Sequence, residues 1–136
     1  MPTGTYSIQV WARNAGSPAR YEAYTPVASY ILKPAPATAV ILDPPPSPAS
    51  PQVPGASVLW SASASGGTGP YEYKFWLKGP GGAWTVARDY AAGNAWTWNT
   101  TGLTTGTYSV QVFARAAGST ALYEAYTPVA SYVLNN

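Results

Sequence analysis

Apolar and polar residues alternate with a period of two along most of the chain, which is the pattern of half-buried β-strands. The clearest case is 71–78, YEYKFWLK, whose odd-numbered residues are all apolar or aromatic. Clusters of Gly and Pro such as GGTGP (66–70) separate these runs, and no segment shows a helical period. The pattern therefore predicts an all-β protein, with strands over 38–43, 56–63, 71–78, 83–88, 95–100, 107–115 and 121–134.

The chain also contains a long internal repeat. Residues 3–33 align without gaps on 105–135, at an offset of 102 residues, and only seven of the 31 positions differ. A period of about 100 residues is the length of one β-sandwich module and too long for a solenoid repeat. We therefore expect a complete antiparallel β-sandwich of about seven strands over 38–136. Residues 34–37 are expected to be a linker, and 1–33 a partial repeat that duplicates the last two strands as an extra β-hairpin.

Two stretches carry a family resemblance. GASVLWSASASGGTGPYEYKFW (55–76) and the later TTGTYSVQVFAR (104–115) resemble the immunoglobulin-like, PKD-like and fibronectin III-like tandem repeats of bacterial secreted or surface proteins. The resemblance implies an immunoglobulin-like sandwich that acts as a spacer, adhesive or substrate-presenting module. It supplies no catalytic residues. The N-terminal residues lack the pattern of a signal peptide, so a secretion signal is expected outside this sequence.

The composition narrows the chemistry. The chain has no histidine and no cysteine, so it lacks the usual general base, the commonest metal ligand and any thiolate. Its seven basic residues are scattered and the net charge is only +2, which does not favour nucleic-acid binding. We expect no enzyme activity, no cofactor, no metal and no membrane span. The alternative for calcium is a site that combines Asp89 with loop carbonyls.

Aromatic residues fall into two groups by their phase in the strands. Most are expected in the core, namely Trp60, Tyr73, Phe75, Trp96 and Trp98, and the hydroxyl of Tyr108 is expected to bond to nearby backbone. A second group is out of phase with the core face and forms a candidate binding surface: Trp76 and Phe113, with Lys74, Gln111 and Arg115 beside them, and Trp11 in the partial repeat. Such a surface suits a polysaccharide ring or a surface protein. The alternative is that these rings only cover the sheet beneath Lys and Arg stems.

The partial repeat raises a question of stoichiometry. The apolar inner face of such a hairpin needs the earlier strands of a sandwich to pack on. The sequence encodes two hairpins of this kind but only one set of earlier strands. The four residues of 34–37 span at most about 14 Å, too little for the first hairpin to replace the second within one chain. Self-association is therefore expected, as a homo-oligomer or head-to-tail assembly, by edge pairing, hairpin pairing or domain swapping. The candidate residues are Tyr6, Ile8, Val10, Tyr21, Tyr24 and Tyr30. Alternatively, residues 1–33 are the remainder of a cut tandem array.

Overall fold

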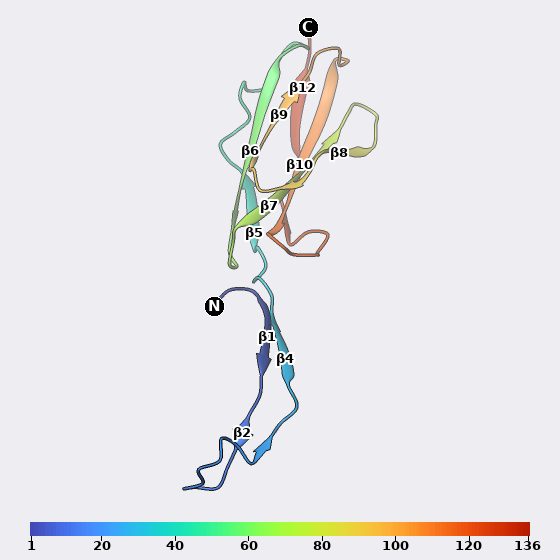
Figure 1. Cartoon of the computed structure of the whole chain (residues 1–136). Helices are drawn as coiled ribbons and strands as arrows, with labels where there is room; N and C mark the ends of the chain where they lie inside the picture. Colours follow the sequence, from blue (N-terminus) through green and yellow to red (C-terminus); the bar gives the residue numbers. More distant parts are fainter. The chain divides into compact units, whose positions relative to one another are not determined.

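A computed structural model describes all residues from Met1 to Asn136, and every regular element in it is a β-strand (Figure 1). The chain divides into two compact units, unit 1 (Met1–Lys33) and unit 2 (Pro34–Asn136). The all-β class predicted from the alternating pattern is confirmed. None of the elements is a helix of the length and apolarity that a membrane span requires.

Unit 2 consists of two antiparallel sheets that share one core, in a β-sandwich-like arrangement. The first sheet has the order β5-β6-β9. In the second, β10 pairs with β7 along one edge and with β11 and β12 along the other, and β8 pairs with the far side of β7. The strands are β5 (Ala39–Leu42), β6 (Ser57–Ser65), β7 (Tyr71–Lys78), β8 (Trp84–Ala91), β9 (Ala95–Asn99), β10 (Gly106–Ala116), β11 (Ala125–Tyr126) and β12 (Ala130–Leu134).

The core of unit 2 follows the period-two alternation. Trp60, Phe75 and Trp98 are buried, as the pattern predicts. Tyr132 of β12 is also fully buried, with its ring centroid 5.8 Å from Trp60 and 5.6 Å from Trp98. Trp96 is half-buried and packs against Phe75 at 5.9 Å. Because each fully buried large side chain contributes about 1.5–3 kcal/mol, this aromatic cluster is a main source of the stability of unit 2.

Several predicted strand boundaries differ from those of the structure, and two differ by three residues or more. The segment 121–134 was expected to be one strand, but it forms β11 and β12 with a break at Thr127 to Val129. Pro128 lies in the break, and proline has no N–H for a ladder bond. Strand β8 continues to Ala91, three residues beyond the expected end at Arg88, because it pairs with β7 through a register irregularity.

Tyrosine hydroxyls fasten the loops of unit 2 to its sheets. Tyr108 donates to the carbonyl of Thr104 at 2.9 Å, the nearby backbone bond that its position predicts. Tyr132 donates to the carbonyl of Pro48 at 2.7 Å, which holds the proline-rich segment against the core. A buried tyrosine needs such a partner because an unpaired hydroxyl in the core is costly.

Residues 34–37, expected to be a linker, are hydrogen-bonded within unit 2. The N–H of Ala35 donates to Thr68 Oγ1 at 3.0 Å, and the N–H of Ala37 donates to Glu124 Oε2 at 2.8 Å. Gly67 lies directly under this segment, since a Cβ at Gly67 would clash with the carbonyl oxygens of Ala35 and Pro36. The segment is therefore anchored to unit 2 at two points.

Unit 1 has the same local structure as the end of unit 2. Its strands are β1 (Gly4–Ile8), β2 (Trp11–Ala12), β3 (Ala23–Tyr24) and β4 (Ala28–Leu32). Strand β1 pairs with β4 from Gly4↔Leu32 to Ile8↔Ala28, the register that β10 has with β12 after the offset of 102 residues. The strands differ in that β10 is continuous to Ala116, whereas its counterpart breaks into β1 and β2 and ends at Ala12. Strand β10 is paired on its other edge by β7, and β1 and β2 have no such partner.

Candidate functional site

The outer face of β7 and β10 brings together the binding residues predicted in unit 2. These strands are adjacent, with Gln111 opposite Trp76 and Phe113 opposite Lys74. The ring centroids of Trp76 and Phe113 are 5.6 Å apart, and Lys74 Nζ lies 4.8 Å from the Trp76 ring. Gln111 donates to the carbonyl of Thr127 at 2.8 Å, so its amide serves the fold. Both rings are half-buried, as expected for aromatics that cover a sheet.

Two tyrosines that the sequence did not single out extend this aromatic surface. Tyr123 packs against Phe113 at 4.9 Å, and Tyr126 meets Tyr123 edge-to-face at 5.5 Å. Both are exposed. The signal that points to them is the repeat itself, because Tyr21 and Tyr24 occupy the equivalent positions beside Trp11.

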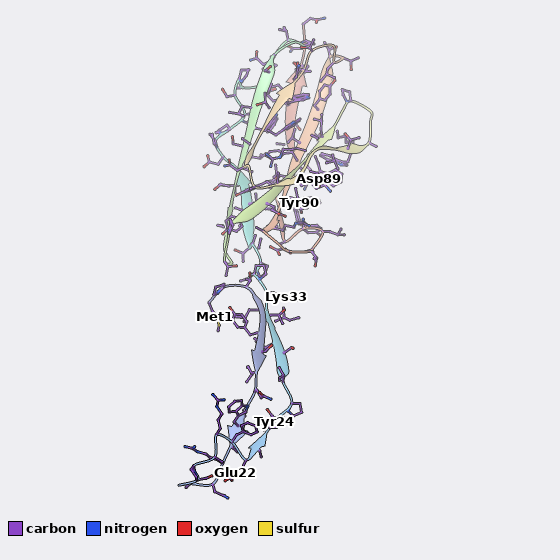
Figure 2. The ribbon with its side chains drawn as sticks, viewed as in Figure 1. Met1, Glu22, Tyr24, Lys33, Asp89 and Tyr90 are labelled. Atoms are coloured by element: carbon purple, nitrogen blue, oxygen red, sulfur yellow. The ribbon has the colours of Figure 1, made fainter.

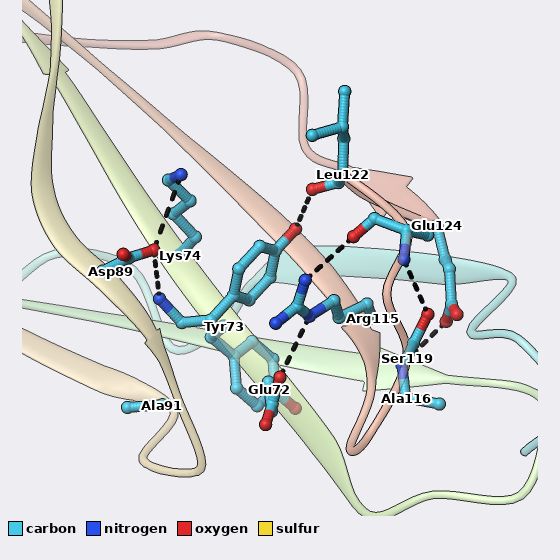
Figure 3. A network of polar contacts seen from close by, with 12 residues as sticks. Glu72, Tyr73, Lys74, Asp89, Ala91, Arg115, Ala116, Ser119, Leu122 and Glu124 are labelled. Atoms are coloured by element: carbon cyan, nitrogen blue, oxygen red, sulfur yellow. Dashed lines mark hydrogen bonds and ion pairs between the residues drawn. The ribbon is translucent and has the colours of Figure 1, made fainter.

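A polar network lies next to the aromatic surface (Figure 3). Arg115 forms a 3.0 Å ion pair with Glu72 and donates to the carbonyl of Ala121 at 2.9 Å. Its guanidinium carbon lies 3.8 Å from the centroid of the Tyr90 ring. The hydroxyl of Tyr90 donates to the carbonyl of Leu122. Tyr90 was missed by sequence reasoning because its strand was expected to end before it.

A hollow of about 340 Å³ borders this network. It is lined by Lys74, Asp89, Tyr90, Arg115, Thr120, Ala121 and Leu122. Lys74 is paired with Asp89 at 3.5 Å. The backbone N–H of Tyr90 and then the Lys74 ammonium lower the pKa of Asp89. Burial raises the pKa of Tyr90 to about 12, against the opposing charge of Arg115. The hydroxyl at the hollow is therefore a neutral hydrogen-bonding group at physiological pH.

Three of the four acidic side chains of unit 2 are engaged with different partners. Glu72 pairs with Arg115, Asp89 with Lys74, and Glu124 accepts the backbone N–H groups of Ala37 and Ala116. Burial alone would raise the pKa of Glu124, but hydrogen bonds from Ser119, Ala116 and Ala37 lower it below its ordinary value. No group of three or more acidic side chains gathers where it could hold a metal ion. The network therefore offers paired charges that stabilise the fold.

Unit 1 carries its own copy of the aromatic surface. Trp11 packs against Tyr21 at 4.7 Å, and Tyr21 meets Tyr24 edge-to-face at 5.3 Å. Figure 2 shows Tyr24 near the loop end of unit 1 that also carries Glu22. Tyr21 and Tyr24 are exposed in unit 1, and their equivalents Tyr123 and Tyr126 are exposed in unit 2 as well. The exposure of these tyrosines is therefore not a difference between the two units.

The opposite face of unit 1 is where the two units differ. We call this the inner face, made of Tyr6, Ile8, Val10, Ala12, Tyr30 and Leu32. Ile8, Val10 and Tyr30 are 58%, 59% and 61% exposed. Their equivalents Val110, Val112 and Tyr132 are fully buried, and Tyr108, the equivalent of Tyr6, is buried too. Of the residues predicted for self-association, Tyr6, Ile8, Val10 and Tyr30 thus share one apolar face.

Comparison of the chain with protein-family models, with curated proteins and with solved structures gave no match.

Proposed function

We propose that the chain is a non-catalytic structural repeat module with an immunoglobulin-like sandwich in unit 2. In this proposal unit 1 is the last hairpin of a second sandwich of the same kind. The support is the repeat at 102 residues together with the shared register of β1–β4 and β10–β12. A spacer or adhesion role in a secreted or surface bacterial protein follows from the resemblance of 55–76 and 104–115 to repeats of such proteins.

The exposed inner face of unit 1 carries the proposal of self-association. The same residue types that fill the core of unit 2 stand in water in unit 1, as Val10 (59% exposed) and Val112 (0%) show. Removing apolar surface from water is favourable by about 25 cal/mol per Å². The inner face therefore favours contact with another chain, and association is the expected behaviour of the protein in solution.

The test compares Val10→Asp with Ser29→Asp by light scattering and analytical ultracentrifugation at micromolar concentration. Val10 lies on the inner face, whereas Ser29 is an exposed polar residue of β4 outside the inner face. The parent chain and Ser29→Asp are expected to self-associate, and Val10→Asp to be monomeric with the unfolding of unit 2 unchanged. A monomeric parent chain with protease-sensitive residues 1–33 contradicts the proposal.

A second candidate function is a small binding module on the outer face of β7 and β10. The observation that favours it is the aromatic surface beside the hollow, with Tyr126 58% exposed and available for stacking. Against it, Lys74 and Arg115 already have carboxylate partners. The discriminating measurement is tryptophan fluorescence with a panel of polysaccharides. A saturable shift that Tyr126→Ala abolishes supports binding, whereas no response leaves the structural role.

A further inference from the structure

Unit 2 shows what covers the inner face when it is buried. The residues that meet this face lie on β5, β6, β7 and β9, with Val58, Trp60, Phe75 and Trp98 among them. We call the segment Ala39–Asn99, which contains β5 to β9, the platform. The platform also pairs with one edge of β10. Eight residues of β10 lie opposite residues of β7, on the edge that is not paired with β12. We propose that unit 1 docks on the platform of a second copy of the chain, in the place of that copy's own residues 103–136.

This inference rests on the proposed function and names the partner surface of the inner face. Unit 1 already has part of the internal geometry that docking needs. The N–H of Val10 donates to Thr25 Oγ1 at 3.0 Å, and Val112 donates to Thr127 Oγ1 at the same distance. Gln9 and Gln111 donate to the carbonyls of Thr25 and Thr127 at 2.9 and 2.8 Å. The hydrogen bonds of Gln9 and Val10 in unit 1 are therefore already those of the docked hairpin in unit 2, and the break between β1 and β2 is the part that docking has to close.

A platform suits unit 1 better than a second copy of unit 1 does. Two inner faces packed together bury a footprint of about 30 Å by about 10 Å, on the order of 300 Å² per partner. A stable interface typically buries about 800 Å² per partner. Such a pair also leaves the edge of β1 without a strand. The platform covers the face and pairs this edge, as β7 does for β10.

In the intact chain unit 1 competes with the hairpin of residues 103–136 that already covers the platform of the same chain, which we call the resident hairpin. The resident hairpin is joined to the platform by the short turn at 101–105 and so has a high effective concentration. Docking of unit 1 from another copy must displace the resident hairpin. This covers the inner face of unit 1 but exposes the apolar face of the displaced hairpin, so the number of exposed hairpin faces does not change. The yield of docking is therefore measured by trapping the contact, whereas light scattering reports every contact of the inner face. The chain contains no cysteine, so introduced cysteines report only the designed contact.

The trap uses the register between β10 and β7. Ser109 lies opposite Lys78, and Ser7 is the equivalent of Ser109. Cα atoms of opposite residues in antiparallel strands are about 4.5–5.5 Å apart, within the range for a disulfide. A chain with Ser7→Cys is mixed with a mass-tagged chain with Lys78→Cys. The mixture is refolded from urea, so that both hairpins meet an uncovered platform, and is then oxidised.

Two controls frame the measurement. The double variant Ser109→Cys with Lys78→Cys is expected to close its disulfide within one chain, which verifies the register. Ser29→Cys mixed with Lys78→Cys is the matched control for random collision. Ser29 is exposed and pairs with Ser7, but its equivalent Ser131 lies on β12, which pairs with the edge of β10 away from β7.

The expected result is a yield of mixed disulfide between the Ser7→Cys and Lys78→Cys chains that is about tenfold above the Ser29→Cys control. Equal yields overturn docking on the platform. If the yields are equal and the parent chain still self-associates through Val10, the proposed function stands and the contact is a different one. If the parent chain is monomeric as well, both fail.

Discussion

At the scale of single residues, the side chain of Thr127 supplies a hydrogen-bond acceptor for β10 in the break between β11 and β12. Its hydroxyl accepts the N–H of Val112 at 3.0 Å, and Thr127 is fully buried. Thr127→Val keeps the shape but leaves that N–H unpaired in the core, so a loss of about 1–3 kcal/mol of unfolding free energy is expected. Thr25→Val removes the equivalent bond in exposed unit 1 and is the matched control. Urea unfolding monitored by tryptophan fluorescence measures both, and equal losses would contradict the role of burial.

The raised pKa of Tyr90 predicts that the free energy of unfolding decreases at alkaline pH. Burial raises its pKa to about 12 in the folded protein, above the ordinary value of 10.0. Between these values the unfolded chain loses the phenol proton while the folded chain keeps it. The contribution of Tyr90 is therefore complete below pH 10 and declines as the pH rises toward 12.

The test compares Tyr90→Phe with Tyr123→Phe by urea unfolding at about pH 9 and about pH 11. Tyr90→Phe is expected to be less stable than the parent at the lower pH by about 1 kcal/mol, because its bond to Leu122 is lost. The difference is expected to shrink at the higher pH. Tyr123 is an exposed tyrosine without a hydrogen bond from its hydroxyl, and its variant is expected to follow the parent. A constant difference for Tyr90→Phe would show that the hydroxyl is not shielded.

Alternation along the strands predicted part of the core of unit 2, but it did not single out Tyr132, which is fully buried, and Trp96 is only half-buried. Trp60, Phe75 and Trp98 follow directly from the period-two pattern, and so does the outward phase of Trp76 and Phe113. The polar network was not predictable in this way. Its contacts join residues that are far apart in sequence, such as Arg115 with Glu72, and depend on the register of three strands that a local pattern does not contain.

At the scale of elements, the segment 34–37 shows that a proline-rich stretch can be fixed by its contacts with one sheet. Gly67 adopts a φ of +69°, and a side chain there would meet the carbonyl oxygens of Ala35 and Pro36. Gly67→Ala is expected to lower the free energy of unfolding by roughly 1–2 kcal/mol, the cost of a left-handed conformation for a residue with a Cβ, and by a further amount from the clash. Gly118→Ala is the matched control, since Gly118 has a φ of +82° and open space around it. Thermal unfolding of the two variants checks this, and equal effects would mean that the segment moves freely away.

The repeated hairpin separates local from non-local information. Its sequence is sufficient for the same register in both units, because the side chains that set it are repeated with it. Its burial is not encoded locally. Val10 and Val112 are the same residue in the same phase, and only the strands on the platform make one exposed and the other buried. This is why the sequence predicted the hairpin pattern but left open what the inner face packs on.

At the scale of the whole molecule, two of the seven differences between the repeats decide which hairpin fits the platform better. Val110 and Ala116 are fully buried, and unit 1 has Ile8 and Asn14 at these positions. The extra methylene of Ile8 overpacks a filled core, at a cost of about 1–3 kcal/mol. The amide of Asn14 enters a site sized for a methyl group, and an unpaired buried amide costs about 1–3 kcal/mol more. The resident hairpin is favoured by both.

Reversing these two differences should make unit 1 a better competitor for the platform. The double change Ile8→Val with Asn14→Ala, placed in the Ser7→Cys chain, is expected to raise the yield of mixed disulfide with the Lys78→Cys chain by about tenfold. Arg20→Leu is the matched control from the same set of differences, because its equivalent Leu122 is 85% exposed and does not enter the core. The control is expected to leave the yield unchanged. Equal yields for the double change and for Arg20→Leu would mean that unit 1 meets its partner through a surface other than the one that β10 and β12 bury in unit 2.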